Sequence, residues 1–401
     1  MSDPGPTDAA PPGSAAAGSP DAASLDEERL ATVRLAMTPG VGPLIARSLL
    51  DRFGTAAAVF RGHDASWREV SGVGAKVARA LGDASTEAAA HRELARCRQS
   101  DVQILTAHDD GYPALLREIP DAPLMLSMRG EITAQDGLAV ALVGSRTCTL
   151  YGRQSAERLA RGLARAGITV ISGLARGIDA AAHRGALDAG GRTIAVTAGG
   201  LARLYPPEHV DLARDIVAAG AVLTESPLDR EPTRGLFPQR NRIISGLSQA
   251  IVVVEATRKS GALHTARHAK EQDRDVFAVP GHITDPTSEG CHDLLRDGAM
   301  LVRDVDDILE ALGPLAEPIR TSAGDETTVS TTTLGARERT LSELEQTVLQ
   351  AVPQQPTHTD EVMQSLGESL TPSQVVSTLT VLEMRRFVQR HPGGFVVRVP
   401  G

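Results

Sequence analysis

The stretches LAVALVGSR at residues 138–146 and ITVISGLARG at residues 168–177 decide the fold. Each is a short apolar run that ends in glycine, a small residue and arginine, and the amphipathic pattern Gln154–Ala166 lies between the two. Apolar strands that alternate with helices are typical of a parallel sheet covered on both faces. These two stretches therefore predict an α/β fold.

The same alternation continues on the C-terminal side. Apolar runs predict strands at Leu138–Val143, Ile168–Ser172, Thr193–Ala198, Ala221–Thr224, Ile251–Val254, Val276–Val279 and Met300–Val302. Helical patterns lie between them at Gln154–Ala166, Asp179–Ala189, Val210–Ala219 and Ala262–Gln272. We therefore expect a doubly wound, mostly parallel sheet that binds its ligand beyond the carboxyl ends of its strands.

Composition divides the rest of the chain. Residues 1–24, almost all Ala, Pro, Gly and Ser, predict a disordered tail, and residues 313–340, rich in Thr and Ser, predict a linker. The folded regions are then a helical domain at 25–100, the α/β core at 101–312 and a third domain at 341–401. The third domain has three helical patterns and two short strands, which favour a winged helix. Its four arginines and six acidic residues favour a protein-contact or accessory role.

The helical domain contains a short repeat. Gly40-Val41-Gly42 and Gly72-Val73-Gly74 are 32 residues apart, and each precedes a helical pattern. A Gly-x-Gly turn between helices resembles the helix-hairpin-helix motif, whose backbone amides can hold a phosphate. Tight turns between packed helices explain the same glycines, so both interpretations stay open.

Charge is distributed unevenly along the core. The whole chain carries a formal net charge of −9, yet residues 141–270 hold 18 Arg and Lys against 10 Asp and Glu, and the next forty hold 3 against 11. Glycine and small polar residues also follow four predicted strands, at 144–146, 172–177, 199–200 and 260–261. Such strand ends attract anions, because backbone amides at the following helix starts point at the ligand. Solvated arginines on helix surfaces explain part of the basic excess.

Several classes of site are absent from the sequence. It contains no P-loop and no Gly-x-Gly-x-x-Gly fingerprint, and its three cysteines lie far apart, which fits a reducing cytoplasm. No histidine pair has a convincing metal-ligand spacing, and no long apolar run or secretory leader is visible. Asp179, Glu225 and Glu255 are candidate acids or bases, although Asp179 more simply orients a helix start. We therefore predict no catalytic residues, no metal, no cofactor and no membrane contact.

The core resembles the DNA-processing protein A (DprA/Smf) family. The most specific match is FPQRNRII at residues 237–244. The other matching pieces, in family order, are YP at 112–113, PL at 123–124, Gly130, VGSR at 143–146, YG at 151–152, SGLARGID at 172–179, His183, YP at 205–206, VEA at 254–256, SG at 260–261 and PG at 280–281. Two departures are modest: Thr197-Ala198-Gly199 replaces a more usual Leu-Gly-x-Gly turn, and Arg234 stands where relatives often have lysine.

The resemblance implies an extended Rossmann-like core that dimerises, binds single-stranded DNA and loads a RecA-type recombinase during natural transformation or recombination. Phosphates would meet backbone amides and arginines, with Phe237 available to stack on a base. The implied nucleic-acid-binding residues are Gly144, Ser145, Arg146, Ser172, Gly173, Arg176, Arg234, Phe237, Arg240, Asn241, Arg242, Ser260 and Gly261. For Arg240 and Asn241 an alternative is that they only hold the loops at the sheet edge.

An enzyme is the alternative function. Rossmann-like phosphoribohydrolases, which cleave nucleotides, place a Pro-Gly-Gly-x-Gly-Thr turn at an equivalent strand end. Here Thr257-Arg258-Lys259-Ser260-Gly261 stands at that position. The sequence therefore favours a DNA-binding protein without catalytic activity.

Overall fold

The computed structural model describes residues 22–313, 343–353, 357–366, 370–384, 387–391 and 395–398. The chain forms two compact units, Met1–Thr321 and Ser322–Gly401. The predicted linker, apart from residue 313, and most of the predicted tail lie outside the described residues. Helix α1 already begins at Ala22, so the tail predicted to reach residue 24 is too long by three residues.

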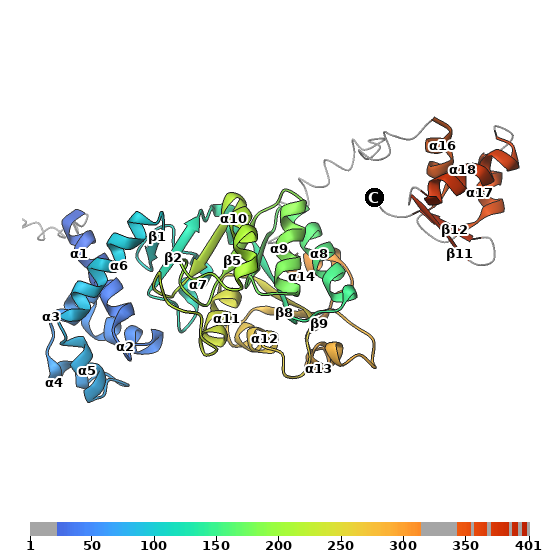
Figure 1. The fold of residues 1–401 in the computed structure, drawn as a ribbon. Helices are drawn as coiled ribbons and strands as arrows, with labels where there is room; N and C mark the ends of the chain where they lie inside the picture. Colours follow the sequence, from blue (N-terminus) through green and yellow to red (C-terminus); the bar gives the residue numbers. More distant parts are fainter. Residues whose placement is uncertain are drawn as a thin grey trace, which may run out of the picture. The chain divides into compact units, whose positions relative to one another are not determined.

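The first unit is built on a nine-stranded sheet with the order β1-β2-β6-β5-β4-β3-β7-β8-β9 (Figure 1). The strands are β1 Gln103–Thr106, β2 Met125–Gly130, β3 Ala139–Gly144, β4 Thr169–Ser172, β5 Thr193–Val196, β6 Ala221–Thr224, β7 Ala250–Glu255, β8 Asp275–Ala278 and β9 Met300–Leu301. Strands β3 to β9 pair in parallel, while β1–β2 and β2–β6 are antiparallel. The predicted α/β class is confirmed, and every predicted strand lies within two residues of its observed bounds.

Helices cover both faces of this sheet (Figure 1). They are α7 Ala114–Glu118, α8 Leu150–Arg165, α9 Ile178–Asp188, α10 Val210–Ala219, α11 Leu236–Gly246, α12 Ala262–Glu271, α13 Glu289–Arg296 and α14 Val305–Leu312, with 3₁₀ turns η1 Ala134–Gly137, η2 Pro207–His209 and η3 Pro286–Ser288. Alternate residues of β3 enter different hydrophobic clusters, Ala141 and Val143 in one and Val140 and Leu142 in the other. Helices α11, α12 and α13 pack in the first cluster, and α8, α9 and α14 in the second.

Strand β3 marks the point where the strand order reverses. The chain proceeds from β3 through β4 and β5 to β6 on one side, and then continues with β7, β8 and β9 on the other. In an open parallel sheet, the crevice beyond the carboxyl ends at such a point is the usual ligand site. The turns after β3, β4, β5 and β7 therefore meet at one place.

Six helices precede the sheet: α1 Ala22–Met37, α2 Pro43–Phe53, α3 Ala56–Arg61, α4 Asp64–Arg68, α5 Ala75–Leu81 and α6 Ser85–Gln99. The two Gly-Val-Gly turns lead into α2 and α5 with matching geometry, because Gly40 has φ +87° and Gly72 has φ +85°. Their packing is reciprocal. A Cβ on Gly40 would lie 3.1 Å from Val77, which follows the second turn, and one on Gly72 would lie 3.2 Å from Ile45, which follows the first.

The second unit contains helices α16 Glu343–Ala351, α17 Thr359–Leu366 and α18 Pro372–Met384. Its strands, β10 Thr357–His358, β11 Val388–His391 and β12 Phe395–Arg398, form an antiparallel sheet in the order β10-β12-β11. Val348, Val362, Leu379 and Val396 belong to its core. Three helices with a small sheet are the arrangement expected of a winged helix. Across both units, the described part of the chain has no helix of the length and apolarity that a membrane crossing requires.

Candidate nucleic-acid interface

A cavity of about 360 Å³ lies where the turns after β3, β4 and β7 meet α11. It is open to solvent and is lined by both polar and apolar side chains. The predicted residues that line it are Gly144, Ser145, Arg146, Phe237, Arg240, Asn241, Ser260 and Gly261. The structure therefore brings together eight of the thirteen predicted residues, from three separate segments of the chain.

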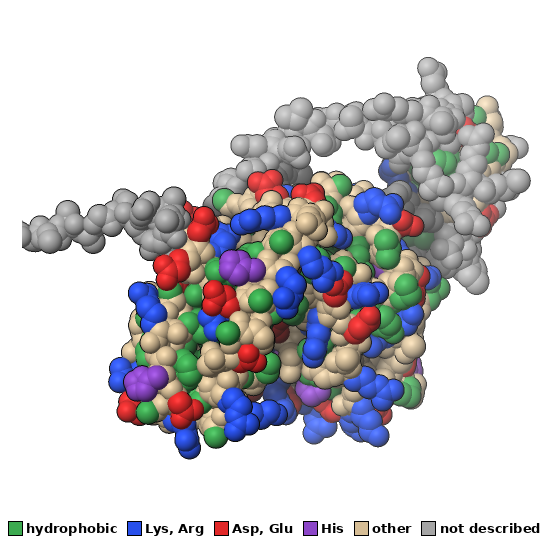
Figure 2. Space-filling model, turned by 60° about the vertical axis from the view of Figure 1, so that its left-hand side comes forward, with side chains coloured by type: hydrophobic (Ala, Val, Ile, Leu, Met, Phe, Trp, Pro, Cys, Tyr) green, Lys and Arg blue, Asp and Glu red, His purple; other side chains and the backbone are tan. Residues whose placement is uncertain are grey.

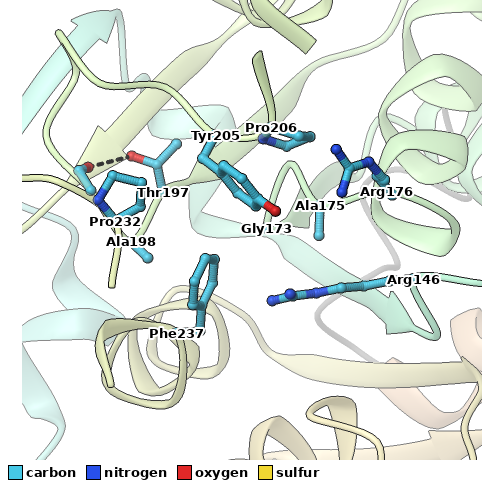
Figure 3. A pocket seen from close by; sticks show the side chains of 11 residues that line it. Arg146, Gly173, Ala175, Arg176, Thr197, Ala198, Tyr205, Pro206, Pro232 and Phe237 are labelled. Atoms are coloured by element: carbon cyan, nitrogen blue, oxygen red, sulfur yellow. Dashed lines mark hydrogen bonds between the residues drawn. The ribbon is translucent and has the colours of Figure 1, made fainter. Parts of the chain in front are cut away.

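A narrower cleft adjoins this cavity and shares Arg146 and Phe237 with it. Arg146 is exposed, and its guanidinium carbon lies 4.6 Å from the centre of the Phe237 ring. Tyr205 meets Phe237 edge to face at 5.9 Å, and Arg176 lies 5.7 Å from the Tyr205 ring. Figure 3 shows these four side chains directed toward one another from separate loops and from α11. We call this group of Arg146, Arg176, Tyr205 and Phe237 the aromatic–arginine cleft.

The exposed predicted arginines differ in their partners; Arg146 and Arg176 line the cleft, whereas Arg234 lies in the β6 loop outside the residues that line the cleft and the cavity. Within the described residues, no carboxylate lies within ion-pair distance of Arg146 or of the exposed Arg234. Arg176 forms an exposed ion pair with Glu208. Because an exposed ion pair is worth little, a phosphate can replace Glu208 at low cost. Arg146 and Arg234 are thus free to bind an anion, and Arg176 becomes so when its pair opens.

Arg240 holds two loops together beneath the cleft. Its side chain is buried, with 5% exposed, and Nη1 donates to the backbone oxygens of Gly173 at 2.6 Å and of Val196 at 2.5 Å. Burial lowers the pKa of Arg240 to about 10 despite the nearby carboxylate of Asp179. The same burial raises the pKa of Asp179, which accepts a hydrogen bond from the amide of Ala175. Arg240 thus fixes the ends of β4 and β5.

The neighbouring residues of α11 also have protein partners. Arg242 is buried between two carboxylates, with Nε 3.0 Å from Asp121 and Nη2 2.7 Å from Glu225. Asn241 donates from Nδ2 to the backbone oxygen of Gly261 at 3.1 Å. The side chains of Arg242 and Asn241 therefore support the surrounding loops, and the alternative of a loop-holding role fits Asn241 as it fits Arg240.

The glycines at the strand ends serve packing inside the protein. A Cβ on Gly144 would lie 2.6 Å from Ile178 and 2.8 Å from the Glu255 oxygen, and one on Gly173 would collide with Arg240. Ser172 is equally internal, since its Oγ donates to the Leu142 oxygen at 2.6 Å. A Cβ on Gly261, in contrast, would have nothing within 4 Å. Of the small residues, Gly261 leaves open space for a ligand.

Glu255, one of the candidate acids, and His183 are occupied by structural contacts. Buried Glu255 accepts hydrogen bonds from the Thr149 amide, the Thr149 hydroxyl and the Thr287 hydroxyl at 2.7–2.9 Å. His183 pairs through Nδ1 with the Thr193 hydroxyl at 2.7 Å, and burial lowers its pKa to about 3, so its ring is neutral. Where the structure describes the chain, it has no group of three metal-ligating side chains. The site is therefore equipped to bind an anion and a ring.

Sequence reasoning missed Tyr205 and Leu174. Tyr205 is one of only three tyrosines, and its place in the cleft depends on contacts with Arg176 and Phe237 that lie far from it in sequence. Leu174 has φ +58°, a left-handed conformation that costs a residue with a side chain roughly 1–2 kcal/mol. No local sequence signal marks a leucine in this conformation. Strained backbone of this kind is found preferentially at functional sites.

Acidic and basic side chains are interspersed over the face of the first unit seen in Figure 2. This face carries no continuous basic surface, and what distinguishes the candidate site is its own side chains. At the edge of the sheet, Arg146, which has no carboxylate partner among the described residues, lies beside the rings of Phe237 and Tyr205. We therefore expect a strand of nucleic acid to be recognised by a few contacts at the cleft.

Comparisons with known proteins bear on the family and the fold of this chain. Residues 103–313 match the model of the DNA recombination-mediator protein A family, and residues 333–394 match a model described as the DprA winged helix domain. Protein Smf of Synechocystis is 36% identical over 378 residues, which are 88% of this chain and 94% of that protein. The X-ray structure of DNA processing protein A from Streptococcus pneumoniae has a TM-score of 0.58 at 32% identity and covers 71% of this chain and 97% of that one. A Helicobacter pylori DNA processing protein A structure, described by its single-stranded DNA binding mode, has a TM-score of 0.46 at 28% identity and covers 55% and 99%.

Proposed function

Because the chain belongs to the DNA recombination-mediator protein A family, we propose that it binds single-stranded DNA at the aromatic–arginine cleft and acts in DNA recombination. Membership confirms the resemblance inferred from the sequence motifs. The observation that carries the proposal is Arg146, an exposed arginine that lies against Phe237 without a carboxylate partner in the described residues.

The cleft suits a single strand for a physical reason. Phe237 and Tyr205 can stack on a base only if that base is unpaired and turned outward. A guanidinium beside the ring can donate two parallel hydrogen bonds to one phosphate. Because the whole chain has only ten aromatic residues, phosphate contacts dominate the affinity, and sequence preference is small.

The thirteen predicted residues divide into two roles in this proposal. Four side chains that are at least partly exposed contact the single-stranded DNA: Arg146, Arg176, Arg234 and Phe237. Gly261 offers the open space beside them. The others hold the loops in place: Gly144, Ser145, Ser172, Gly173, Arg240, Asn241, Arg242 and Ser260.

Delivery of the strand to a RecA-type recombinase and dimerisation through the sheet domain belong to the same proposal. The support for both is membership of a recombination-mediator family. We expect the protein to act in the cytoplasm, where the recombinase and the single strands would meet. Light scattering would give the oligomeric state, and recombinase assembly on a labelled strand, with and without this protein, would test delivery.

Binding without catalysis is also proposed. Glu255 is held by two threonines, and Asp179 lies beneath the cleft with an amide and arginine beside it. Neither carboxylate is placed as a free acid or base. Incubation with nucleoside monophosphates, followed by analysis for released base, would separate binding from the phosphoribohydrolase alternative.

The decisive test is a comparison of labelled single strands and duplexes of equal length by fluorescence anisotropy, without ATP. We expect preference for the single strand, with affinity that falls steeply as salt rises. Equal affinity for the two at moderate salt would contradict the proposal.

A further inference from the structure

Three of the loops that form the aromatic–arginine cleft each bury one leucine. They follow β4, β5 and β6, and their leucines are Leu174, Leu201 and Leu228, with 0%, 2% and 1% exposed. The β4 loop carries Arg176, the β5 loop carries Tyr205, and the β6 loop, residues 225–235, leads directly into Phe237. The loops that carry the binding side chains are thus each anchored inside the protein.

All three leucines belong to one hydrophobic cluster, and part of that cluster comes from the N-terminal helices. Val33 of α1 and Ala90 and Cys97 of α6 are buried members of it. A loop backbone is mobile unless side chains or hydrogen bonds tie it down. The N-terminal helices therefore form part of the surface on which the cleft loops rest.

A buried carboxylate ties the β6 loop to α6. Glu93 has 6% of its surface exposed, and its Oε1 accepts a hydrogen bond from the backbone amide of Leu228 at 2.6 Å. The thiol of Cys97 donates to the same oxygen at 3.7 Å. Burial and the charge of Glu93 raise the pKa of Cys97 to about 12, so the thiol keeps its proton. An exposed ion pair between Arg96 and Asp229 lies next to this contact.

The β6 loop in turn holds the β5 loop. The Gly200 amide donates to the Arg230 oxygen at 2.9 Å, and the Ala202 amide donates to the Leu228 oxygen at 3.0 Å. The Ser226 hydroxyl donates to the Ala198 oxygen at 2.8 Å. A displacement of Leu228 therefore affects both the loop that ends at Phe237 and the loop that carries Tyr205.

We propose that Glu93 is a positioning residue for single-stranded DNA binding, and that helix α6 sets the place of Phe237 and Tyr205 through the β6 loop. Glu93 lies in the protein interior and does not contact the single-stranded DNA. The inference rests on the proposed function, and it assigns the N-terminal helices a part in the binding site.

The first test measures single-strand affinity after Glu93→Ala, which leaves the buried Leu228 amide without an acceptor. Affinity should fall about fivefold to tenfold, and no further than in the variant that combines Phe237→Ala with Tyr205→Ala, because the change acts through those two rings. Glu93→Gln keeps an acceptor oxygen and should restore most of the affinity. Glu87→Ala, on the same helix but in a half-exposed ion pair with Arg34, is the matched control and should bind normally.

A double-mutant cycle separates positioning from general destabilisation. In the background that combines Phe237→Ala with Tyr205→Ala, Glu93→Ala should weaken binding by less than twofold if it acts through these two rings. Additive losses would overturn the proposal, as would normal affinity in a folded Glu93→Ala protein. If Glu93→Ala does not fold, Asp229→Ala breaks only the exposed ion pair and should produce a smaller loss, which should likewise be absent in the Phe237→Ala, Tyr205→Ala background.

Amide hydrogen exchange without DNA keeps this inference distinct from the proposed function. The Leu228 amide and its neighbours up to Phe237 should exchange about tenfold faster in Glu93→Ala, while α12 should be unchanged. Unchanged exchange in this loop would overturn the positioning role, whether or not the protein binds DNA. A wild-type protein that binds no single strand refutes the proposed function and also the part of this inference that concerns DNA.

Discussion

Arg146→Ala is the change that tests the binding site most directly. The guanidinium is exposed, lies 4.6 Å from the centre of the Phe237 ring, and has no carboxylate partner in the described residues. A hydrogen bond to a charged group is worth about 1.5–3 kcal/mol, and each 1.4 kcal/mol is tenfold in affinity. We therefore expect single-strand binding to weaken about tenfold to a hundredfold.

Two further quantities identify the reason for that loss. Loss of one phosphate contact should flatten the slope of log affinity against log salt by about 0.7. Stability should change little, because an exposed cation–π contact is worth only about 0.5–1 kcal/mol. Anisotropy over a series of salt concentrations, with a melting curve on the same preparation, measures all three quantities.

Arg165→Ala is the matched control. Arg165 is an exposed arginine in the last turn of α8, and this 16-residue helix runs from the binding edge toward the opposite edge of the sheet, about 24 Å away. Arg165→Ala should change neither the single-strand affinity nor the slope of log affinity against log salt. Arg146→Lys keeps the positive charge and should therefore keep the wild-type slope of log affinity against log salt. It should not keep the full affinity, because lysine cannot donate two parallel hydrogen bonds to one phosphate. A destabilised Arg146→Ala protein with an unchanged slope would refute the assignment and place Arg146 in the scaffold.

Three other changes probe the rest of the site. Phe237→Ala should weaken single-strand binding by about 1–3 kcal/mol at every salt concentration without changing the slope, because stacking releases no counterions; a changed slope in the anisotropy series would contradict this. Removal of Met1–Ser24 together with Gly313–Gly401 should leave a folded protein that still binds, as anisotropy and circular dichroism would measure, because the cleft lies wholly within the first unit. Arg242→Ala leaves the partly buried carboxylates of Asp121 and Glu225 without their cationic partner and should lower the free energy of unfolding by about 3–5 kcal/mol in a denaturant titration. A stable Arg242→Ala protein with weakened DNA binding would instead make Arg242 a contact residue.

The positions of the parallel strands of the core were predictable because buried parallel strands appear as short apolar runs. Two kinds of element were missed. Strand β2 has the sequence MLSMRG, without a β-branched residue, and together with β1 it adds to the sheet in antiparallel fashion. Helix α11 has seven consecutive buried residues, 240–246, two of them arginine, so it has no amphipathic stripe to reveal it. Both elements, β2 and α11, form because of the segments they pack against in the fold, which the local sequence does not show.

The place where the candidate site residues gather was predictable from the strand ends, but the partners of each side chain were not. Arg146 and Arg240 are both arginines near glycine in the sequence. Only the fold reveals that Arg146 is exposed beside a ring and that Arg240 is enclosed by two backbone oxygens. The contribution of α6 was likewise hidden, because Glu93 and Leu228 are 135 residues apart.

The pairing of β3 with β7 has a consequence for the order in which the site is made. The amide of Ser145, next to Arg146, donates to the oxygen of Glu255 at the end of β7, 110 residues later. A growing chain that ends before β7 has β3 as an unpaired edge, and the turn that carries Arg146 lacks its hydrogen bond to Glu255. DNA affinity would therefore arise late in synthesis, after the ribosome has passed β7, and a nascent chain would not capture single strands before its core can close.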